Sequence, residues 1–284
     1  MSENTQLTPQ EQAKLNNGNI VPFMTHPAIQ KSISNMIGEE KTTRFVGSII
    51  SAVQANKQLG ECTNSSILSA ALLGESLELP PSPQLGFYYF VPYKNKGVYE
   101  AQFQMGWKGL VQLAERSGQY RKIVASEVKE GELVEYNPIT EEFTLSPIAD
   151  DVARQKAKVI GFYAMFELTN GFRKEIYWSK EKMQHHAETY SSGYRSDIKN
   201  KTKYTFWSKD FSSMALKTML RQLISKWGIM SIQMQKAYQG DQAIIREDGT
   251  YDYVDNTETP EEVIDSVATE VSENQNTIPF EPES

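Results

Sequence analysis

Two hairpin patterns in the middle of the chain constrain its fold most strongly. Residues 158–168 and 172–178 are rich in β-branched and aromatic side chains, and they flank the tripeptide Thr169-Asn170-Gly171. An Asn-Gly pair supplies the two positive φ angles that a type I′ turn requires, so we predict a tight antiparallel hairpin here. Residues 87–93 and 98–105 form a second hairpin pattern, whose second strand alternates apolar with polar side chains and so predicts one polar face.

Helical patterns lie on both sides of these hairpins. Apolar side chains recur at helical spacing in residues 45–53 and 67–72, and a longer apolar stripe covers residues 211–227. A short helix is predicted for residues 107–117, and residues 121–128 resume the sheet. Antiparallel hairpins between helices predict an α+β fold, with a mostly antiparallel sheet and helices packed against it.

Charge and composition divide the chain unevenly. Residues 1–26 are rich in Asn, Gln, Thr and Ser and predict a flexible N-terminal arm, while residues 27–240 form the predicted core. Residues 241–284 hold 13 Asp or Glu against one Arg, which predicts an acidic, disordered C-terminal tail. The formal net charge is −7, yet residues 152–240 alone carry +10. This basic block indicates a polyanionic partner, although a solvated lysine-rich surface balanced by the tail explains it equally well.

Several broad classes are excluded by what the sequence lacks. No apolar run approaches the roughly 18–20 residues that span a bilayer, and the first residues do not resemble a signal peptide, so we expect a cytoplasmic protein without a membrane partner. The single cysteine, Cys62, cannot form an internal disulfide, and three histidines leave a zinc site short of ligands. The adjacent His185 and His186 would point about 100° apart on a helix, which predicts packing or surface roles.

Motifs of known enzymes are scarce. The sequence has no G-x-x-x-x-G-K-[ST] phosphate loop and no G-x-S-x-G nucleophile motif, which argues against an ATPase and a serine hydrolase. Glu127-Val128-Lys129 fits the E-x-K tripeptide of metal-dependent nucleases, but no second carboxylate occupies a matching position upstream. A nuclease therefore stays the alternative, and we expect a protein without a catalytic or metal site.

Cations and aromatic side chains are interleaved in residues 199–209. They are Lys199, Lys201, Lys203, Tyr204, Phe206, Trp207 and Lys209. Such a set combines attraction for phosphates with flat surfaces that stack on bases or ribose, and the alternative is a basic loop whose rings pack inward. Lys217 and Arg221 are four residues apart on the predicted long helix, about 40° apart around its axis, and can present two cations to neighbouring phosphates.

Three blocks of residues share their order and spacing with a known family. The first contains Ala101-Gln102-Phe103-Gln104-Met105-Gly106-Trp107-Lys108-Gly109, and the second contains Glu167-Leu168-Thr169-Asn170-Gly171-Phe172-Arg173-Lys174. The third begins with Trp207-Ser208-Lys209-Asp210-Phe211 and ends with Ser225-Lys226-Trp227-Gly228. Through these blocks, roughly residues 40–235 resemble the RecT family of phage and prophage single-strand annealing recombinases.

The resemblance implies an ATP-independent protein with a Rad52-like annealing core. Such a protein coats single-stranded DNA, brings in a complementary strand and holds the new duplex on an oligomeric ring or filament. The implied partners are single-stranded and annealed duplex DNA, further copies of the chain, a 5′ to 3′ exonuclease and the host single-strand binding protein. No cofactor is implied, although a divalent ion can act through the DNA. A milder alternative is a protein that coats single strands without annealing them.

The expected DNA contacts are drawn from the basic and polar positions within these blocks. For phosphates we expect Lys108, Arg116, Arg173, Lys174, Lys209, Lys217, Arg221 and Lys226. Gln102 and Gln104 are expected to hydrogen-bond sugar or phosphate, and Trp107 and Trp207 are expected to stack on bases or sugars unless they belong to the core.

The acidic tail has three possible roles. It competes with DNA for the basic surface, recruits a basic partner, or only aids solubility. Its Ile278-Pro279-Phe280 resembles the acidic tip of single-strand binding proteins, but four further residues follow it here.

Overall fold

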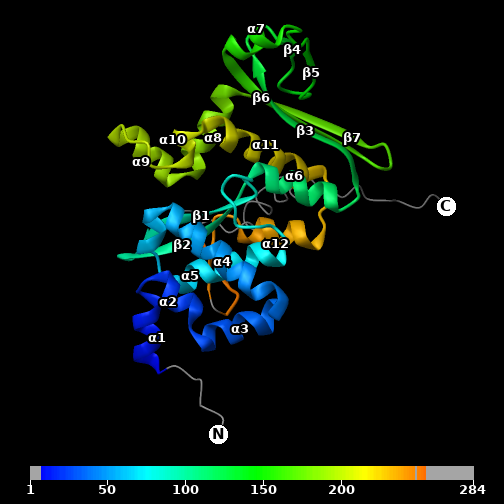
Figure 1. The fold of residues 1–284 in the computed structure, drawn as a ribbon. Coiled ribbons are helices and arrows are strands. Elements are labelled where there is room, and N and C mark those ends of the chain that lie inside the picture. The colour runs from blue at the N-terminus through cyan, green and yellow to red at the C-terminus, as the bar shows by residue number, and fades with distance from the viewer. Residues whose placement is uncertain (1–7, 247, 254–284) are drawn as a thin grey trace, which may run out of the picture.

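The computed structural model describes residues 8–246 and 248–253 (Figure 1). The N-terminal part is helical, with α1 (Pro9–Asn16), α2 (Ile20–Thr25), α3 (Pro27–Ile37), α4 (Glu39–Ala55), the 3-10 helix η1 (Lys57–Glu61) and α5 (Asn64–Ser76). The middle contains β1 (Tyr88–Asn95), β2 (Val98–Met105), α6 (Trp107–Arg116), β3 (Tyr120–Lys129), β4 (Leu133–Tyr136), β5 (Phe143–Leu145), α7 (Asp151–Lys156), β6 (Val159–Leu168) and β7 (Arg173–Ser179). The last part contains α8 (Lys180–Tyr190), α9 (Ser192–Asn200), α10 (Phe206–Lys209), α11 (Phe211–Trp227), α12 (Ile232–Gly240), β8 (Ile244–Ile245) and β9 (Tyr251–Asp252).

The β1–β2 hairpin packs against α5, among the N-terminal helices (Figure 1). Tyr88 pairs with Met105 in the antiparallel register, and both side chains are buried. The Tyr88 ring stacks on Phe103 with 4.9 Å between the ring centroids. A Cβ on Gly74 of α5 would lie 2.3 Å from the Tyr88 ring, so only glycine lets the helix and the strand approach this closely. The hairpin and the helix that the sequence predicts here are confirmed.

A second, three-stranded antiparallel sheet has the order β3-β6-β7, and α11 crosses one of its faces. The β6 side chains Phe162, Ala164 and Phe166 are buried in the core, and the Phe162 ring lies 6.0 Å from that of Phe211 at the start of α11. Helices α8, α9 and α10 gather beside the sheet, at the N-terminal end of α11 (Figure 1). This arrangement of helices on antiparallel sheets confirms the α+β class.

Successive residues of β7 point to opposite faces of this sheet. The register pairs Phe166 with Lys174, and the buried Phe166 places Lys174 on the face that α11 covers. Arg173 therefore lies on the other face, where it pairs with Glu175 at 2.7 Å. The Tyr163 hydroxyl donates to the same Glu175 at 2.9 Å.

The turn between β6 and β7 differs from the expected type. Gly171 has a φ of 86°, but Asn170 is not among the residues with a positive φ. The Asn170 side chain instead accepts a hydrogen bond from the Phe172 backbone N–H at 2.9 Å. The hairpin is thus confirmed, and the type I′ turn predicted for it is wrong. Two consecutive positive φ angles occur in the other hairpin, at Lys96 and Gly97.

The flexible arm expected for residues 1–26 is wrong over residues 8–26. Thr8 and Glu11 form a capping box that starts α1, and Ile20, Phe23 and Met24 of α2 are buried in the core. The polar composition of the stretch concealed one short apolar segment, and burial of that segment orders it. Residues 1–7 lie outside the described residues.

The core also extends beyond residue 240, where the acidic tail was expected to begin. Asp241 is buried, Ala243 forms a β-bridge with Phe103, and Ile244 and Ile245 are buried. Residues 254–284, which include Ile278-Pro279-Phe280, lie outside the described residues. Over residues 8–246 and 248–253, no helix combines the length and the apolar character needed to cross a membrane.

Candidate nucleic-acid interface

Cations and aromatic rings from three parts of the chain meet where α6 and α10 begin beside β1. Lys108 Nζ lies 5.9 Å from the centroid of the Trp107 ring, and Lys209 Nζ lies 6.0 Å from that of the Phe206 ring. Tyr89 of β1 contacts the second pair, with its ring 5.5 Å from the Phe206 ring. We name Tyr89, Trp107, Lys108, Phe206 and Lys209 the cation–aromatic patch.

Gly86 brings Lys108 beside Tyr89 within this patch. Gly86 has a φ of 68°, and a Cβ there would lie 3.0 Å from the Tyr89 hydroxyl and 3.5 Å from Lys108 Cδ. Lys108 and Lys209 are exposed, and the three rings are partly open to solvent. Among the described residues neither lysine has an ion-pair partner, so the patch offers two cations next to flat surfaces, the combination with which proteins hold single strands.

The segment between α9 and α11 divides its aromatic side chains between solvent and core. Tyr204 is 75% exposed, whereas Trp207 is 8% exposed. The Trp207 ring packs against Phe211 and Tyr194, with centroid distances of 5.3 and 6.1 Å. Of the two roles expected for Trp207, stacking on bases or packing in the core, its burial favours the core. Tyr204 and Phe206 are the rings that the segment presents to solvent.

A second exposed group lies at the C-terminal end of α11. Lys174 Nζ lies 4.5 Å from the centroid of the Trp227 ring, and Lys226 Nζ lies 5.8 Å from it. Lys226 is exposed, and Lys174 and Trp227 are half-buried. We name Lys174, Lys226 and Trp227 the Trp227 cluster. The structure thus brings two of the expected phosphate contacts together here, away from Lys108 and Lys209.

Lys217 and Arg221 lie together as their spacing predicts, but they share one buried carboxylate. Lys217 Nζ donates to Asp241 at 2.8 Å, Arg221 donates to it at 2.5 Å, and the Met105 backbone N–H donates at 2.9 Å. Burial lowers the pKa of Lys217, and the neighbouring Asp241 opposes that shift. Lys217 is only 4% exposed, which contradicts the expectation that it contacts a phosphate. Arg221 keeps 29% of its side chain exposed, with its charge already paired.

Two other expected contacts are engaged within the fold. Arg116 donates to two backbone oxygens at the end of α5, at 2.6 and 3.2 Å, and to Gln233 of α12 at 2.9 Å. It therefore joins α6 to α5 and α12. Arg173 is exposed and paired with Glu175, on the sheet face opposite α11. Lys174 and Arg173 are neighbours in sequence that the sheet separates.

One residue of the polar face predicted for β2 is buried in the core. Gln102 is fully buried, and its Nε2 has no hydrogen-bond partner among the described residues. Its burial contradicts the expected contact with sugar or phosphate. Gln104 is half-buried and pairs with Tyr89 in the hairpin register, which places it beside the cation–aromatic patch.

The single carboxylate of the E-x-K tripeptide, Glu127, and the nearby Glu132 both take part in internal ion pairs. Lys129 Nζ lies 2.6 Å from Glu127, and the Ser212 hydroxyl also donates to Glu127. Glu132 accepts from Arg154 Nε at 2.6 Å. The part of the chain that the structure describes contains no group of three or more His, Cys, Asp or Glu side chains able to hold a metal ion. These contacts tie β3 to α7 and α11.

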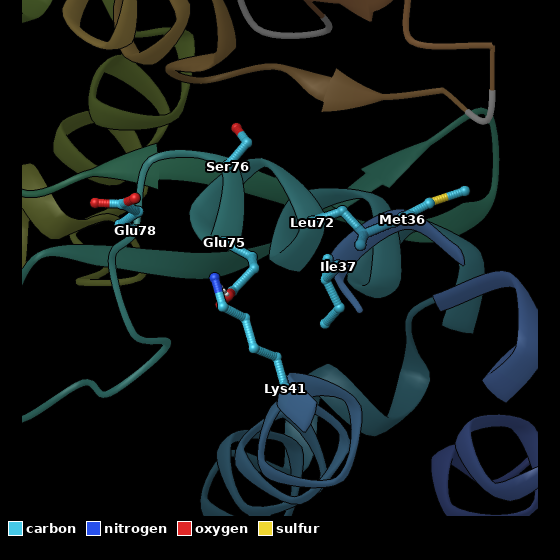
Figure 2. A pocket seen from close by; sticks show the side chains of 7 residues that line it. All are labelled: Met36, Ile37, Lys41, Leu72, Glu75, Ser76 and Glu78. Carbon is cyan, nitrogen blue, oxygen red and sulfur yellow. Dashed lines mark ion pairs between the residues drawn. The ribbon is translucent and has the colours of Figure 1, made fainter. Parts of the chain in front are cut away.

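A hollow of about 410 Å³ lies between α3, α4 and α5 (Figure 2), and its lining contains no member of the cation–aromatic patch or the Trp227 cluster. Figure 2 shows Lys41 of α4 reaching toward Glu75 of α5, and its Nζ lies 3.7 Å from Glu75 Oε1. Glu78 also lines the hollow. With two carboxylates and one ammonium group, this lining repels phosphates.

Two residues that shape the site were not predicted from the sequence. Tyr89 sits in an aromatic-rich strand, and nothing in that strand distinguishes it from its neighbours. Asp197 is 3% exposed and accepts hydrogen bonds from residues 202–208, which carry the exposed rings. The signal for Asp197 was the run of hydroxyl side chains Thr202, Thr205 and Ser208 that follows it.

Comparisons with known proteins agree with the three sequence blocks. The model of the RecT family matches residues 43–257. The uncharacterized protein YqaK of Bacillus subtilis (strain 168) is 38% identical over 266 residues, which are 91% of this chain and 85% of that protein. Protein RecT of Escherichia coli (strain K12) is 24% identical over 235 residues, which are 81% of this chain and 82% of that protein. The chain belongs to the RecT family of annealing proteins, with a role in recombination.

Proposed function

We propose that the protein binds single-stranded DNA and anneals complementary strands without ATP. Membership of the RecT family supports the annealing role. The observation that carries the DNA-binding part is the cation–aromatic patch, where Lys108 and Lys209 are exposed and have no carboxylate partner among the ion pairs of the described residues.

The patch suits annealing because it addresses the backbone of a strand more than its base edges. Lysine ammonium groups attract phosphates whatever the sequence, and aromatic faces stack on any base. Base edges then stay free to test pairing with an incoming strand. Pairing and stacking of the new duplex supply the free energy, so no nucleotide hydrolysis is required.

The Trp227 cluster is the second contact in this proposal. It lies at the opposite end of α11 from Lys209, and 17 helical residues span about 25 Å. That length corresponds to roughly seven stacked base pairs at 3.4 Å each. A strand or new duplex held at both groups would therefore run along α11 for roughly seven nucleotides. The proposed phosphate contacts are Lys108, Lys174, Lys209 and Lys226, with Gln104 and Arg221 at their margins.

The remaining expectations, drawn from the family resemblance and, for the cytoplasm, from the sequence itself, are part of the same proposal. They are a Rad52-like core, assembly of several copies into a ring or filament, a 5′ to 3′ exonuclease and a host single-strand binding protein as partners, a divalent ion that acts through the DNA, and action in the cytoplasm.

Fluorescence anisotropy with a labelled single-stranded oligonucleotide tests the DNA-binding part. We expect binding that weakens with salt at a log-log slope of about −0.7 for each phosphate contacted. Lys108→Ala with Lys209→Ala should weaken binding to all sequences and reduce the slope by about 1.4. The matched control is Lys156→Ala with Lys158→Ala, which removes the same charge beside the β4–β5 hairpin and should change binding little.

Two results would count against this function. The first is binding that does not respond to salt or to the loss of Lys108 and Lys209. The second is cleavage of the oligonucleotide in Mg²⁺ that Glu127→Ala abolishes, because that would establish the nuclease alternative.

A further inference from the structure

Tyr204 is a large aromatic side chain held almost entirely in solvent. It is 75% exposed, and it lies in the short segment between α9 and α10. Phe206, the first residue of α10, is 36% exposed and contacts Tyr89 of the cation–aromatic patch. Lys203 precedes Tyr204 and is also exposed. An exposed ring can serve as a preformed binding surface only if the backbone that carries it is fixed.

One buried carboxylate holds that backbone. Asp197 accepts hydrogen bonds from the backbone N–H groups of Tyr204, at 3.0 and 3.1 Å, and of Thr205, at 2.8 Å. It also accepts from the hydroxyl groups of Thr202, Thr205 and Ser208, at 2.6, 2.7 and 2.7 Å. Burial alone would raise the pKa of Asp197, but these hydrogen bonds outweigh it and hold the pKa below its usual range. The carboxylate therefore stays charged and fully bonded at neutral pH.

Two packing contacts complete the support. Trp207 anchors the segment in the core, against Phe211 and Tyr194. A Cβ on Gly193 of α9 would lie 2.8 Å from the Thr205 methyl carbon, so a glycine lets the segment sit close against α9. The bonds to Asp197 thus fix the backbone from which the Tyr204 side chain projects. A flexible loop loses backbone entropy when it binds a ligand. Because this segment is already ordered in the folded protein, binding costs it little further entropy.

We propose that Tyr204 is a stacking site for an unpaired nucleobase of the bound strand, and that Asp197 is the residue that positions it. This inference rests on the proposed function and specifies how the strand is held. A tyrosine face stacks on any of the four bases, so the site is indifferent to sequence. Lys203 and Lys209 lie on either side of the ring in sequence and attract the flanking phosphates.

The test compares an oligo-dT strand with an abasic strand of the same length, which keeps the phosphates and lacks the bases. Wild-type protein should bind the oligo-dT strand more tightly than the abasic one. Tyr204→Leu should reduce that preference about 5- to 100-fold, because it removes a base–aromatic stack while keeping an apolar side chain. Tyr204→Phe should retain the preference. The salt slope should be equal in all three proteins, because no cation is changed.

Asp197→Asn tests the positioning role. An amide keeps the size of the side chain but turns one acceptor into a donor that faces the backbone N–H groups. We expect it to reduce the base preference as Tyr204→Leu does, and to have little further effect on that preference in a Tyr204→Leu background. A purely structural role would reduce binding of both strands in either background. Asp150→Asn is the matched control, since Asp150 caps α7 outside the patch.

The outcomes separate this inference from the proposed function. Failure of the wild-type protein to bind either strand overturns the proposed function and the stacking site with it. Salt-dependent binding with an undiminished base preference in Tyr204→Leu overturns only the stacking site. A lost preference in Tyr204→Leu that Asp197→Asn leaves intact overturns the positioning role alone.

Discussion

At the scale of single residues, the buried ionisable groups determine which substitutions destabilise the fold. Asp241 is 4% exposed and accepts from Lys217, Arg221 and the Met105 backbone. A buried pair adds little net stability compared with apolar residues, but removal of one partner leaves an uncompensated charge. Asp241 is therefore more important for holding α11, α12 and β2 together than for any contact with DNA.

We predict that Asp241→Asn lowers the free energy of unfolding by about 3–5 kcal/mol, because Lys217 is then buried without its counter-charge. Urea denaturation measures this directly. Asp151→Asn, an exposed change in α7, should stay within about 0.5 kcal/mol of wild type. The double variant Lys217→Met with Asp241→Asn should lose less stability than Asp241→Asn alone. An equal or larger loss in the double variant would contradict the ion-pair explanation.

We expect His186 to make the stability of the protein depend on pH. Burial lowers its pKa to about 4, with smaller contributions from Arg221 and His185. Unfolded histidine binds a proton near pH 6.5, so the unfolded state is favoured as the pH falls from about 6.5 to about 4. The loss attributable to His186 over this window is about 3 kcal/mol at most. Its ring also packs between Trp178 and Tyr190.

We predict that His186→Phe flattens the stability profile between pH 4 and 6.5, because it keeps an aromatic ring in place and removes the titrating group. Urea unfolding at several pH values in both proteins measures the difference. His185→Phe should leave the profile close to that of wild type, since His185 is exposed. Parallel curves for wild type and His186→Phe would show that another group causes the acid sensitivity.

At the scale of elements, the alternation of β7 separates two cations that are adjacent in sequence. Lys174 lies on the α11 face beside Trp227 and Lys226, and Arg173 lies on the other face with Glu175. A single strand that follows α11 can reach the first and not the second. The sequence block contains both cations, and only the register distinguishes them.

We predict that Lys174→Ala weakens binding to single strands and reduces the log-log salt slope by about 0.7, the value for one phosphate contact. Arg173→Ala removes the same charge one residue away and should leave the slope nearly unchanged. Anisotropy titrations at several salt concentrations compare the two. Equal effects of both variants would contradict a path along α11.

Local patterns predicted most elements but not how they are placed in space. The apolar stripe of residues 211–227 and both hairpins were correct, because periodicity and turn residues act over a few positions. The turn at Asn170 was wrong because its side chain bonds to the backbone in a way that a dipeptide rule does not capture. Residues 8–26 were wrong because composition averages over the few side chains that are buried.

The sequence predicted which charged residues could belong to the candidate site, but it did not predict which of them lie together on the surface. Lys108 and Lys209 are 101 positions apart, and their proximity depends on Tyr89 and Gly86 in a third segment. Lys217 and Arg221 satisfied every local criterion, but Asp241 neutralises part of their charge from 20 or more positions away. A sequence shows which side chains can bind a phosphate, and tertiary packing decides which of them are free.

At the scale of the whole molecule, the four lysines proposed as phosphate contacts form two groups at the two ends of α11. The cation–aromatic patch lies where α6 and α10 begin beside β1, and the Trp227 cluster lies near the β6–β7 hairpin (Figure 1). The sequence indicated one continuous basic block. The fold divides it, with a buried ion pair between the two groups.

The rate of strand annealing tests the proposed function most directly. Two complementary oligonucleotides with a donor and an acceptor dye are mixed without ATP, and energy transfer reports duplex formation over time. We predict that wild-type protein accelerates pairing over the protein-free reaction, and that Lys108→Ala with Lys209→Ala loses most of that acceleration while Lys156→Ala with Lys158→Ala keeps it. Pairing no faster with wild-type protein than without it, under conditions where the strands are bound, would contradict annealing and leave a protein that only coats single strands.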